Sequence, residues 1–356
     1  MKNIHDRILA QIRSGLGVVL ATVVKASGST PQKPGSSALF GEEGLLAGTV
    51  GGGPLEGEVE HIAESVMISR SSDQFYFNLD AENGEDGAIC GGEAEVLVDA
   101  NPSAHLAVFE KLEESMAQRK SGYLLTAVGP KQESGRTLRR YWIRGSSPEE
   151  ISHDLSIDFK KLIKGHLKYA ERYGFVEIDL ANIPQEWDMA YLEYIKPRPH
   201  LVIAGGGHIG KALAQLGSLL AFEVSVVDDR PEFANSKHIP DADHLLVQDI
   251  GSAMKEVQPG PDTYIVIVTR GHTHDGEALR ACIGSGAAYI GMIGSSHKIG
   301  IMRKQFLEEQ WATPEQWASI HAPIGLDIGS KTVEEIAISI AAQLVEVRNR
   351  KMMIHA

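Results

Sequence analysis

The chain has 356 residues, of which 43% are hydrophobic, 23% are charged and 37 are glycine. At about 150 residues per domain this length indicates two domains, and the composition excludes disordered, collagen-like and coiled-coil proteins. The formal net charge of −13 provides no broad basic field that would attract nucleic acid or anionic lipid, so neither is expected as a partner. An anionic ligand would have to be held by local geometry.

Two features of the sequence bear on where the protein works. Its two cysteines, Cys90 and Cys282, are too few for a disulfide framework, which favours a reducing compartment. Residues 4–13 show helical periodicity rather than the unbroken apolar core of a signal peptide, and no apolar run approaches the ~18 residues that cross a bilayer. We therefore expect a cytoplasmic protein without a membrane span.

The first half of the chain predicts a mixed α/β domain over residues 1–195. A helix opens it, and a proline-containing loop follows the first strand. Gly51, Gly52 and Gly53 then lead into a second helix, whose apolar residues recur at helical spacing. Alternation of apolar and polar residues predicts strands at 18–24, 39–40, 45–50, 75–79, 93–98, 123–128, 138–143, 175–180 and 190–195, with helices at 102–118 and 159–173.

The second half, residues 196–356, begins with a stiff connector, Lys196-Pro197-Arg198-Pro199, in which two prolines surround an arginine. Strands are predicted at 200–204, 223–227, 245–248, 264–269 and 288–293, and helices at 211–220, 277–283 and 298–309. Alternation of this kind predicts a doubly wound parallel sheet with helices on both faces, a Rossmann-like fold. The last helix is predicted to begin at a capping box made by Thr332 and Glu335.

A glycine fingerprint follows the first strand of this second domain. Gly205, Gly207 and Gly210 satisfy the G-x-G-x-x-G pattern, with His208 within the turn, and the N-terminal amides of the helix that follows could hold a phosphate group. Asp228 ends the next strand, where a carboxylate would accept a hydrogen bond from a ribose hydroxyl, although Asp229 and Arg230 beside it complicate that assignment. The alternatives are a glycine turn that only packs helix against strand and a Rossmann domain that no longer holds a nucleotide.

Two later strand-to-helix turns also carry polar residues at the carboxyl edge of the predicted sheet. In the segment 269–275 we expect Arg270 and His272 to contact a ligand, whereas metal binding by the His-x-His pattern is not expected, and Asp275 could simply cap the helix. Gly294 and Ser295 could form a second anion-binding turn, or they could serve only chain reversal and capping.

The first domain offers two further candidates. Cys90 precedes two glycines whose backbone amides could lower the pKa of its thiol, which would make it a soft ligand or a sulfur acceptor; the alternative is a small buried hydrophobic residue. Burial is the better interpretation for Cys282, which lies in an apolar helical pattern. Gly51, Gly52 and Gly53 could admit an anion at a helix N-terminus or could only permit close packing.

Taken together, these segments resemble the XdhC/CoxI family, the accessory proteins of xanthine dehydrogenase and related molybdenum hydroxylases. The resemblance runs nearly from end to end. It rests on the segments Gly28–Pro31, Lys33–Gly35, Gly48–Glu56, Cys90–Gly92, Pro199–His208, Val226–Arg230, Thr269–Asp275, Tyr289–Ser295 and Pro323–Gly329. The chain departs from the usual pattern at Gln32 and at Gly35-Ser36-Ser37, where family members often carry arginine.

The resemblance implies a cytoplasmic chaperone, more a maturation factor than an enzyme. Such a protein binds molybdenum cofactor (molybdopterin), presents it for replacement of an oxo ligand by sulfur, and delivers it to a xanthine dehydrogenase-type hydroxylase. One glycine turn would then hold the phosphate while Cys90 approaches the metal. A cysteine desulfurase partner and a homodimer are further expectations. The competing hypotheses are an NAD(P)-dependent oxidoreductase, for which the sequence shows no evident acid/base pair, and a nucleotide-sensing regulatory protein.

Overall fold

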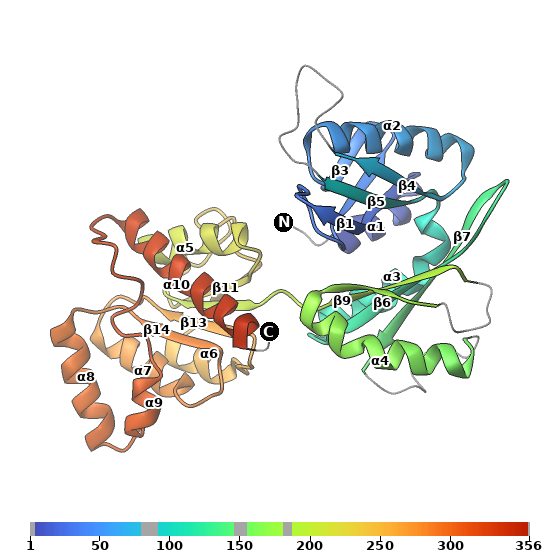
Figure 1. The fold of residues 1–356 in the computed structure, drawn as a ribbon. Coiled ribbons are helices and arrows are strands. Elements are labelled where there is room, and N and C mark those ends of the chain that lie inside the picture. Colours follow the sequence, from blue (N-terminus) through green and yellow to red (C-terminus); the bar gives the residue numbers. More distant parts are fainter. Residues whose placement is uncertain (1–3, 80–91, 146–154, 181–186, 355–356) are drawn as a thin grey trace. The chain divides into compact units, whose positions relative to one another are not determined.

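The computed structural model describes residues 4–79, 92–145, 155–180 and 187–354. By its internal contacts the chain divides into an N-terminal unit, Lys2–Pro197, and a C-terminal unit, Arg198–Ala356. Figure 1 shows the two units joined by the connector that contains both prolines. The N-terminal unit has two sheets and the C-terminal unit one, and each unit has its own apolar clusters.

The N-terminal unit contains two antiparallel sheets. The first has the order β3-β2-β1-β5-β4 and the second the order β7-β6-β9-β8. The elements of this unit are α1 (Ile4–Arg13), β1 (Val19–Gly28), β2 (Ser37–Gly41), β3 (Gly44–Gly48), α2 (Gly53–Ser69), β4 (Asp73–Asn78), β5 (Gly92–Asp99), the 3-10 turn η1 (Pro102–His105), α3 (Leu106–Ala117), β6 (Gly122–Gln132), β7 (Gly135–Arg144), α4 (Ile157–Tyr173), β8 (Phe175–Ile178) and β9 (Met189–Ile195).

The core of this unit follows from the alternation along its strands. Val19, Ala21 and Val23 of β1 pack beneath α2, which contributes Leu55, Val59, Ala63 and Val66. In the same way Phe159, Ile163 and Leu167 of α4 cover one face of the second sheet. The opposite faces of the two sheets pack against each other, since Leu20 and Leu39 share a cluster with Leu124, Trp142 and Ile195. The predicted mixed α/β fold is confirmed.

A buried ion pair crosses between the two sheets. Asp99, at the end of β5, accepts a hydrogen bond from the Arg140 guanidinium of β7, and both side chains are only 3% exposed. The Asp99 carboxylate also accepts from the backbone N–H of Asn101, at 2.9 Å. Because a buried charge needs a partner, each member of this pair depends on the other.

Arg140→Met therefore tests the pair. We expect it to lower the free energy of unfolding by about 3–5 kcal/mol, because it leaves the Asp99 carboxylate buried without its counter-charge. Urea unfolding of the full chain measures the loss. The double variant Asp99→Asn/Arg140→Met, which has no buried charge, should recover part of it. The control is Arg13→Met on the exposed Arg13–Glu113 pair, which should cost less than about 1 kcal/mol. Equal losses at the two arginines would contradict the assignment.

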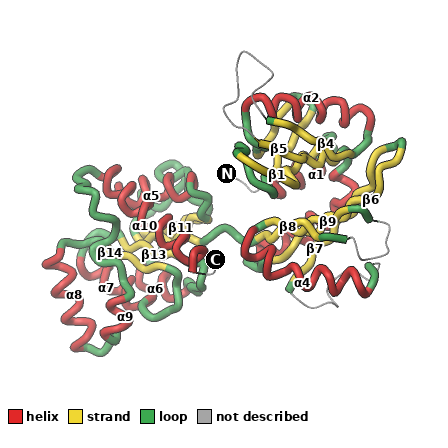
Figure 2. Tube along the Cα trace, viewed as in Figure 1, coloured by secondary structure: helices red, strands yellow, loops and turns green. Residues whose placement is uncertain are grey.

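The C-terminal unit is a doubly wound sheet of five parallel strands in the order β12-β11-β10-β13-β14. Its elements are β10 (His200–Ala204), α5 (His208–Leu219), β11 (Glu223–Asp228), β12 (His244–Val247), α6 (Ile250–Glu256), β13 (Thr263–Ile267), α7 (His272–Cys282), β14 (Tyr289–Met292), α8 (Ser296–Glu308), α9 (Pro314–Ala318) and α10 (Val333–Ile354). Figure 2 shows the red helices on both sides of the yellow strands.

Two apolar clusters lie on the two faces of this sheet. Leu213 of α5 and Ile340 and Leu344 of α10 pack on one face, and α6, α7 and α8 pack on the other. The predicted Rossmann-like fold is therefore confirmed. So is the capping box: the backbone N–H of Glu335 donates to Thr332 Oγ1 at 3.2 Å, and that of Thr332 donates to Glu335 Oε2 at 2.9 Å.

Two short helices were not predicted, α6 and α9. Both have cap signals in the sequence: Asp249 accepts a hydrogen bond from the backbone N–H of Ser252, and Thr313 and Gln316 form a capping box. Each helix is too short to show helical periodicity by itself. The chain after α9 then runs along β14, where His321 forms a parallel bridge with Gly291.

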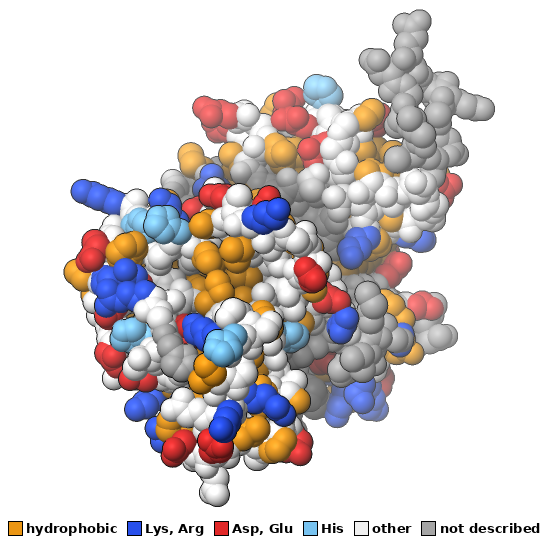
Figure 3. All heavy atoms as spheres, turned by 90° about the vertical axis from the view of Figure 1, so that its left-hand side faces the viewer, with side chains coloured by type: hydrophobic (Ala, Val, Ile, Leu, Met, Phe, Trp, Pro, Cys, Tyr) orange, Lys and Arg blue, Asp and Glu red, His pale blue; other side chains and the backbone are white. Residues whose placement is uncertain are grey.

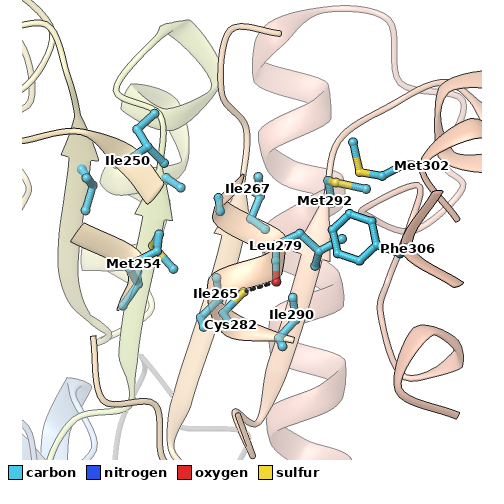
Figure 4. Close-up of a cluster of buried hydrophobic side chains, with 14 of the residues drawn as sticks. Ile250, Met254, Ile265, Ile267, Leu279, Cys282, Ile290, Met292, Met302 and Phe306 are labelled. Carbon is cyan, nitrogen blue, oxygen red and sulfur yellow. Dashed lines mark hydrogen bonds between the residues drawn. The ribbon is translucent and has the colours of Figure 1, made fainter. Parts of the chain in front are cut away.

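Cys282, the last residue of α7, lies in the core, as expected. Its side chain is fully buried among apolar residues, and the Sγ atom lies 3.6 Å from the carbonyl oxygen of Leu279 (Figure 4). Burial raises the pKa of the Cys282 thiol to about 12, so it stays protonated at neutral pH. Along the described ranges, no helix combines the length and the hydropathy that a membrane span requires.

Candidate functional site

The carboxyl ends of β10, β11, β13 and β14 meet at one edge of the C-terminal sheet. From β10 the chain crosses to β11 on one side, whereas β13 lies on the other side of β10. The connections therefore reverse direction between β10 and β13, which is where open parallel sheets bind ligands. The residues at this edge come from the glycine turn, from the end of β11 and from the turns after β13 and β14.

The three glycines of the fingerprint have different structural roles. Gly205 has a φ of 116°, and a Cβ there would lie 2.5 Å from the carbonyl oxygen of Val268. A Cβ on Gly210 would lie 1.9 Å from the carbonyl oxygen of Gly205, so α5 can approach the turn only without a side chain. Around Gly207 a Cβ would meet no atom within 4 Å, and this residue caps α5 without a side-chain hydrogen bond. The approach to the helix N-terminus is thus open at Gly207.

Asp228 forms hydrogen bonds that stabilise the glycine turn. Its carboxylate is buried and accepts hydrogen bonds from the backbone N–H of Gly206 at 2.8 Å, from that of Arg230 at 3.0 Å and from the Arg230 guanidinium at 2.8 and 2.9 Å. Burial by itself would raise the pKa of Asp228, but the hydrogen bonds from Arg230 and Gly206 outweigh it and hold the pKa below its usual value. A ribose hydroxyl would have to compete with these donors.

The carboxylate of the next residue, Asp229, lies close to two arginines. Arg270, in the turn after β13, donates to Asp229 Oδ2 at 2.9 Å, while Arg230 Nε lies 3.9 Å from Asp229 Oδ1. The Arg230 guanidinium also stacks 3.8 Å from the ring centre of Phe233. Both predicted arginines are therefore at the site, and Asp229 links the loop after β11 to the turn after β13.

Asp275 holds the turn after β13 in place through hydrogen bonds. This side chain is fully buried and accepts hydrogen bonds from the hydroxyl and backbone N–H of Thr269, at 2.6 and 3.2 Å, and from the Lys298 ammonium group of α8. The idea that Asp275 caps α7 is wrong, because Gly271 occupies the cap position and has no side chain to contribute. Asp275 instead joins the turn to α8.

The two histidines of this turn lie in the first residues of α7. His272 begins the helix, and His274 Nδ1 lies 3.5 Å from Glu277 Oε2 one turn further along. Within the described ranges, no group of three or more His, Cys, Asp or Glu side chains is placed to hold a metal ion.

The turn after β14 shows the capping that the sequence left as one of two interpretations. The Ser295 hydroxyl accepts a hydrogen bond from the backbone N–H of Lys298 at 3.3 Å, and a Cβ on Gly294 would lie 2.9 Å from Ile299 Cδ1. Lys298 itself was not singled out from the sequence, since its partner Asp275 is 23 residues away.

In the N-terminal unit, the turn before α2 is only partly available to an anion. The Gly51 N–H donates to Thr49 Oγ1 at 3.0 Å, and Glu56 accepts from the Thr49 hydroxyl at 2.6 Å and from Val50 N–H at 3.1 Å. A Cβ on Gly51 would lie 2.6 Å from Pro31 Cγ. Gly52 and Gly53, with φ values of 70° and 58°, have open space around them.

The loop that follows β1 meets the start of β5 beside this turn. Gly28 pairs with Gly92, and a Cβ on Gly92 would lie 2.6 Å from the carbonyl oxygen of Ser27. Cys90 lies outside the described residues, so its expected roles as a ligand or sulfur acceptor stay predictions.

Comparison with known proteins connects both units to one family. Residues 11–77 match the model described as "XdhC and CoxI family", and residues 201–344 match "XdhC Rossmann domain". The chain belongs to the XdhC and CoxI family. One relative, a protein of Bacillus subtilis (strain 168) whose name makes it a probable xanthine dehydrogenase subunit, is 26% identical over 98% of this chain and 99% of its own length.

Two further comparisons extend this result. "Uncharacterized protein YqeB" of Escherichia coli (strain K12) is 36% identical over 43% of this chain, but the match spans only 28% of YqeB. A crystal structure described as a xanthine dehydrogenase from Bacillus halodurans superposes with a TM-score of 0.74, covering 97% of this chain and 96% of that one at 24% identity. This likeness shows that the two proteins share one fold over nearly the whole chain.

Gly210→Ala tests the packing role of the third glycine. We expect a loss of about 1–3 kcal/mol in the stability of the C-terminal unit, since the added methyl group overlaps the Gly205 carbonyl oxygen. Gly207→Ala is the matched control and should cost less than about 1 kcal/mol, because only the cap changes. Thermal unfolding followed by circular dichroism compares the two, and similar melting temperatures would refute the packing role.

Asp228→Asn tests whether this carboxylate stabilises the turn in the absence of any nucleotide. We expect a loss of about 1–3 kcal/mol in the ligand-free chain, because the charged acceptor of Arg230 is removed. The loss should shrink as the pH falls towards the depressed pKa of Asp228, since protonation removes the same acceptor charge from the unmodified chain. Urea unfolding at several pH values measures it. Unchanged stability at pH 7 would show that the hydrogen bonds at Asp228 contribute nothing.

Proposed function

We propose that this protein is an accessory factor that binds molybdenum cofactor, supports its sulfuration and delivers it to a xanthine dehydrogenase-type molybdenum hydroxylase. The observation that carries the proposal is family membership in both units, together with the relative named for xanthine dehydrogenase that aligns over 98% of this chain. The finer steps of cofactor binding, sulfuration and delivery are our inference from the site.

The C-terminal edge suits the phosphate group of the cofactor. Gly207 leaves the N-terminus of α5 accessible, and the positive end of a helix favours phosphate. Arg230 and Arg270 stand beside the turn: Arg270 is paired with Asp229, whereas Arg230 is held mainly by Asp228. An incoming phosphate could replace the Asp229 carboxylate as the partner of Arg270, which would couple cargo binding to a rearrangement of the turn after β13.

Delivery requires a surface for a protein partner. Figure 3 shows hydrophobic side chains gathered on one face of the C-terminal unit, with charged side chains and histidines around them. Exposed large hydrophobic residues of this unit include Ile301, Ile328 and Ile338, each about half exposed. Exposed apolar area of this kind is typical of interaction sites. A cysteine desulfurase partner, a homodimer and a cytoplasmic location stay predictions.

The oxidoreductase hypothesis has less support. Nicotinamide dinucleotides use the carboxylate at the end of the second strand to hold a ribose hydroxyl. Here Asp228 already accepts hydrogen bonds from Gly206 and Arg230. The same argument weakens the nucleotide-sensing alternative.

Anaerobic incubation of the purified chain with molybdenum cofactor tests the proposed function. After removal of free cofactor we expect pterin and molybdenum to be retained in equal amounts, and transfer to a cofactor-free hydroxylase to restore its activity. Cys90→Ala should weaken retention or transfer without lowering the melting temperature. Cys282→Ala, which removes a thiol from the core, is the control and should retain the cofactor.

The outcomes separate the hypotheses. Absence of pterin and molybdenum in the unmodified chain would refute the carrier function, and full transfer by Cys90→Ala would remove only this cysteine from the mechanism. In a parallel titration, NAD should leave the melting temperature unchanged. A rise in melting temperature with NAD would favour a nucleotide-binding function.

A further inference from the structure

The interface between the two sheets of the N-terminal unit has a polar middle. On the inward faces, apolar, polar and apolar residues succeed one another along three strands: Leu20, Thr22 and Val24 in β1, Leu124, Thr126 and Val128 in β6, and Ile195, Glu193 and Tyr191 in β9. Residues two apart in a strand share a face, so these polar residues form a layer between two apolar clusters. We call His5, Thr22, Asp99, Thr126, Arg140 and Glu193 the polar layer.

Within this layer the charge of Arg140 already has a partner. Its guanidinium donates to Asp99, and both side chains are almost completely buried. Arg140 Nη1 also lies 3.5 Å from His105 Nδ1. The Asp99–Arg140 pair is therefore compensated by itself, and a second carboxylate in the layer adds an unmatched negative charge.

Glu193 is that second carboxylate. Its side chain is 26% exposed, its Oε2 atom lies 3.9 Å from His5 Nε2, and it lines a small cavity together with Thr22, Thr126 and Arg140. The cavity measures about 20 Å³, which is room for about one water molecule. Burial raises the pKa of Glu193 to about 7, although Arg140 acts in the opposite direction.

The groups that face Glu193 do not neutralise its charge at neutral pH. Burial, and then the positive charge of Arg140, lower the pKa of His5 on α1 to about 4. The same two causes lower the pKa of His105 on η1 to about 4. Tyr191 on β9 has its pKa raised by burial and stays protonated. Arg140 of β7 is paired with Asp99 of β5, and Glu193 is the carboxyl group of the layer whose pKa burial raises to about 7.

We propose that the polar layer is a proton-controlled joint between the two sheets. The sheets pack tightly while the carboxyl group of Glu193 carries a proton, and they separate more readily once it is ionised, because the second carboxylate then adds negative charge to a layer in which the Arg140 guanidinium is already paired with Asp99. Glu193 lies on β9, which ends at Ile195 and leads directly into the connector of residues 196–199. A change in the joint thus acts on the strand from which the connector starts.

Linkage fixes the expected pH profile. We call the joint closed when the two sheets pack tightly and open when they separate. The carboxyl group of Glu193 binds its proton more tightly in the closed state than in the open state. Its contribution to the free energy of closure is therefore present below about pH 4.5 and is lost by about pH 7. His5 and His105 act in the opposite sense, because their lowered pKa values make closure more favourable as the pH rises from about 4 to about 6.5. The effect of Glu193 on closure must therefore be read from the difference between the unmodified chain and a variant that lacks this carboxyl group.

Hydrogen exchange of the full chain from pH 5 to pH 8, corrected for intrinsic exchange rates, tests the joint. In Glu193→Gln the amides of β1 and β9 should be better protected than in the unmodified chain. The ratio of the two protection factors should grow up to about pH 7 and then stay constant. A pKa shift of Glu193 from 4.5 to about 7 limits the increase in this ratio to about 300-fold, at tenfold per pKa unit. Glu58→Gln, on the exposed side of α2, should leave the ratio at one.

A ratio that does not change with pH would overturn the proposal. If Glu193→Gln fails to fold, the unmodified chain still answers the question through carbon NMR of glutamate carboxyl groups. One glutamate should then titrate near pH 7, and titration of every glutamate below about pH 5, near the ordinary value, would refute the joint.

Discussion

The carboxylate of Asp228 is the contact on which the candidate ligand-binding edge of the C-terminal sheet depends. It ties the end of β11 to the backbone of the glycine turn after β10, and it positions Arg230 at the same time. Hydrogen bonds to a buried carboxylate are among the stronger ones in proteins, so the turn keeps one shape before any ligand arrives. The open space at Gly207 is consequently part of a preformed turn.

Local sequence patterns predicted much of the C-terminal fold. An apolar strand followed by G-x-G-x-x-G and a helix is a short-range signal, and the structure gives each of Gly205 and Gly210 a steric reason for lacking a side chain. The partners of Asp228 could not be predicted in the same way. Gly206 lies 22 residues before it, and only the pairing of β10 with β11 brings the two together. Asp275 and Lys298 pose the same problem.

The N-terminal unit shows a different limit. Alternation predicted its strands well, but a polar residue at an alternate position, such as Thr22 or Glu193, normally indicates a solvent face. That Thr22 and Glu193 face a second sheet depends on the packing of two sheets, which no window of sequence contains. The buried pair of Asp99 and Arg140 was missed for the same reason.

The chain segment beside β14 has a consequence for how copies of this protein behave at high concentration. His321 bridges Gly291, and its backbone carbonyl and N–H bond to Met292 and Ile290, so the segment occupies the outer side of the last strand. An uncovered strand would offer its peptide groups to another chain and invite aggregation. Along this border the sheet is closed to further strands.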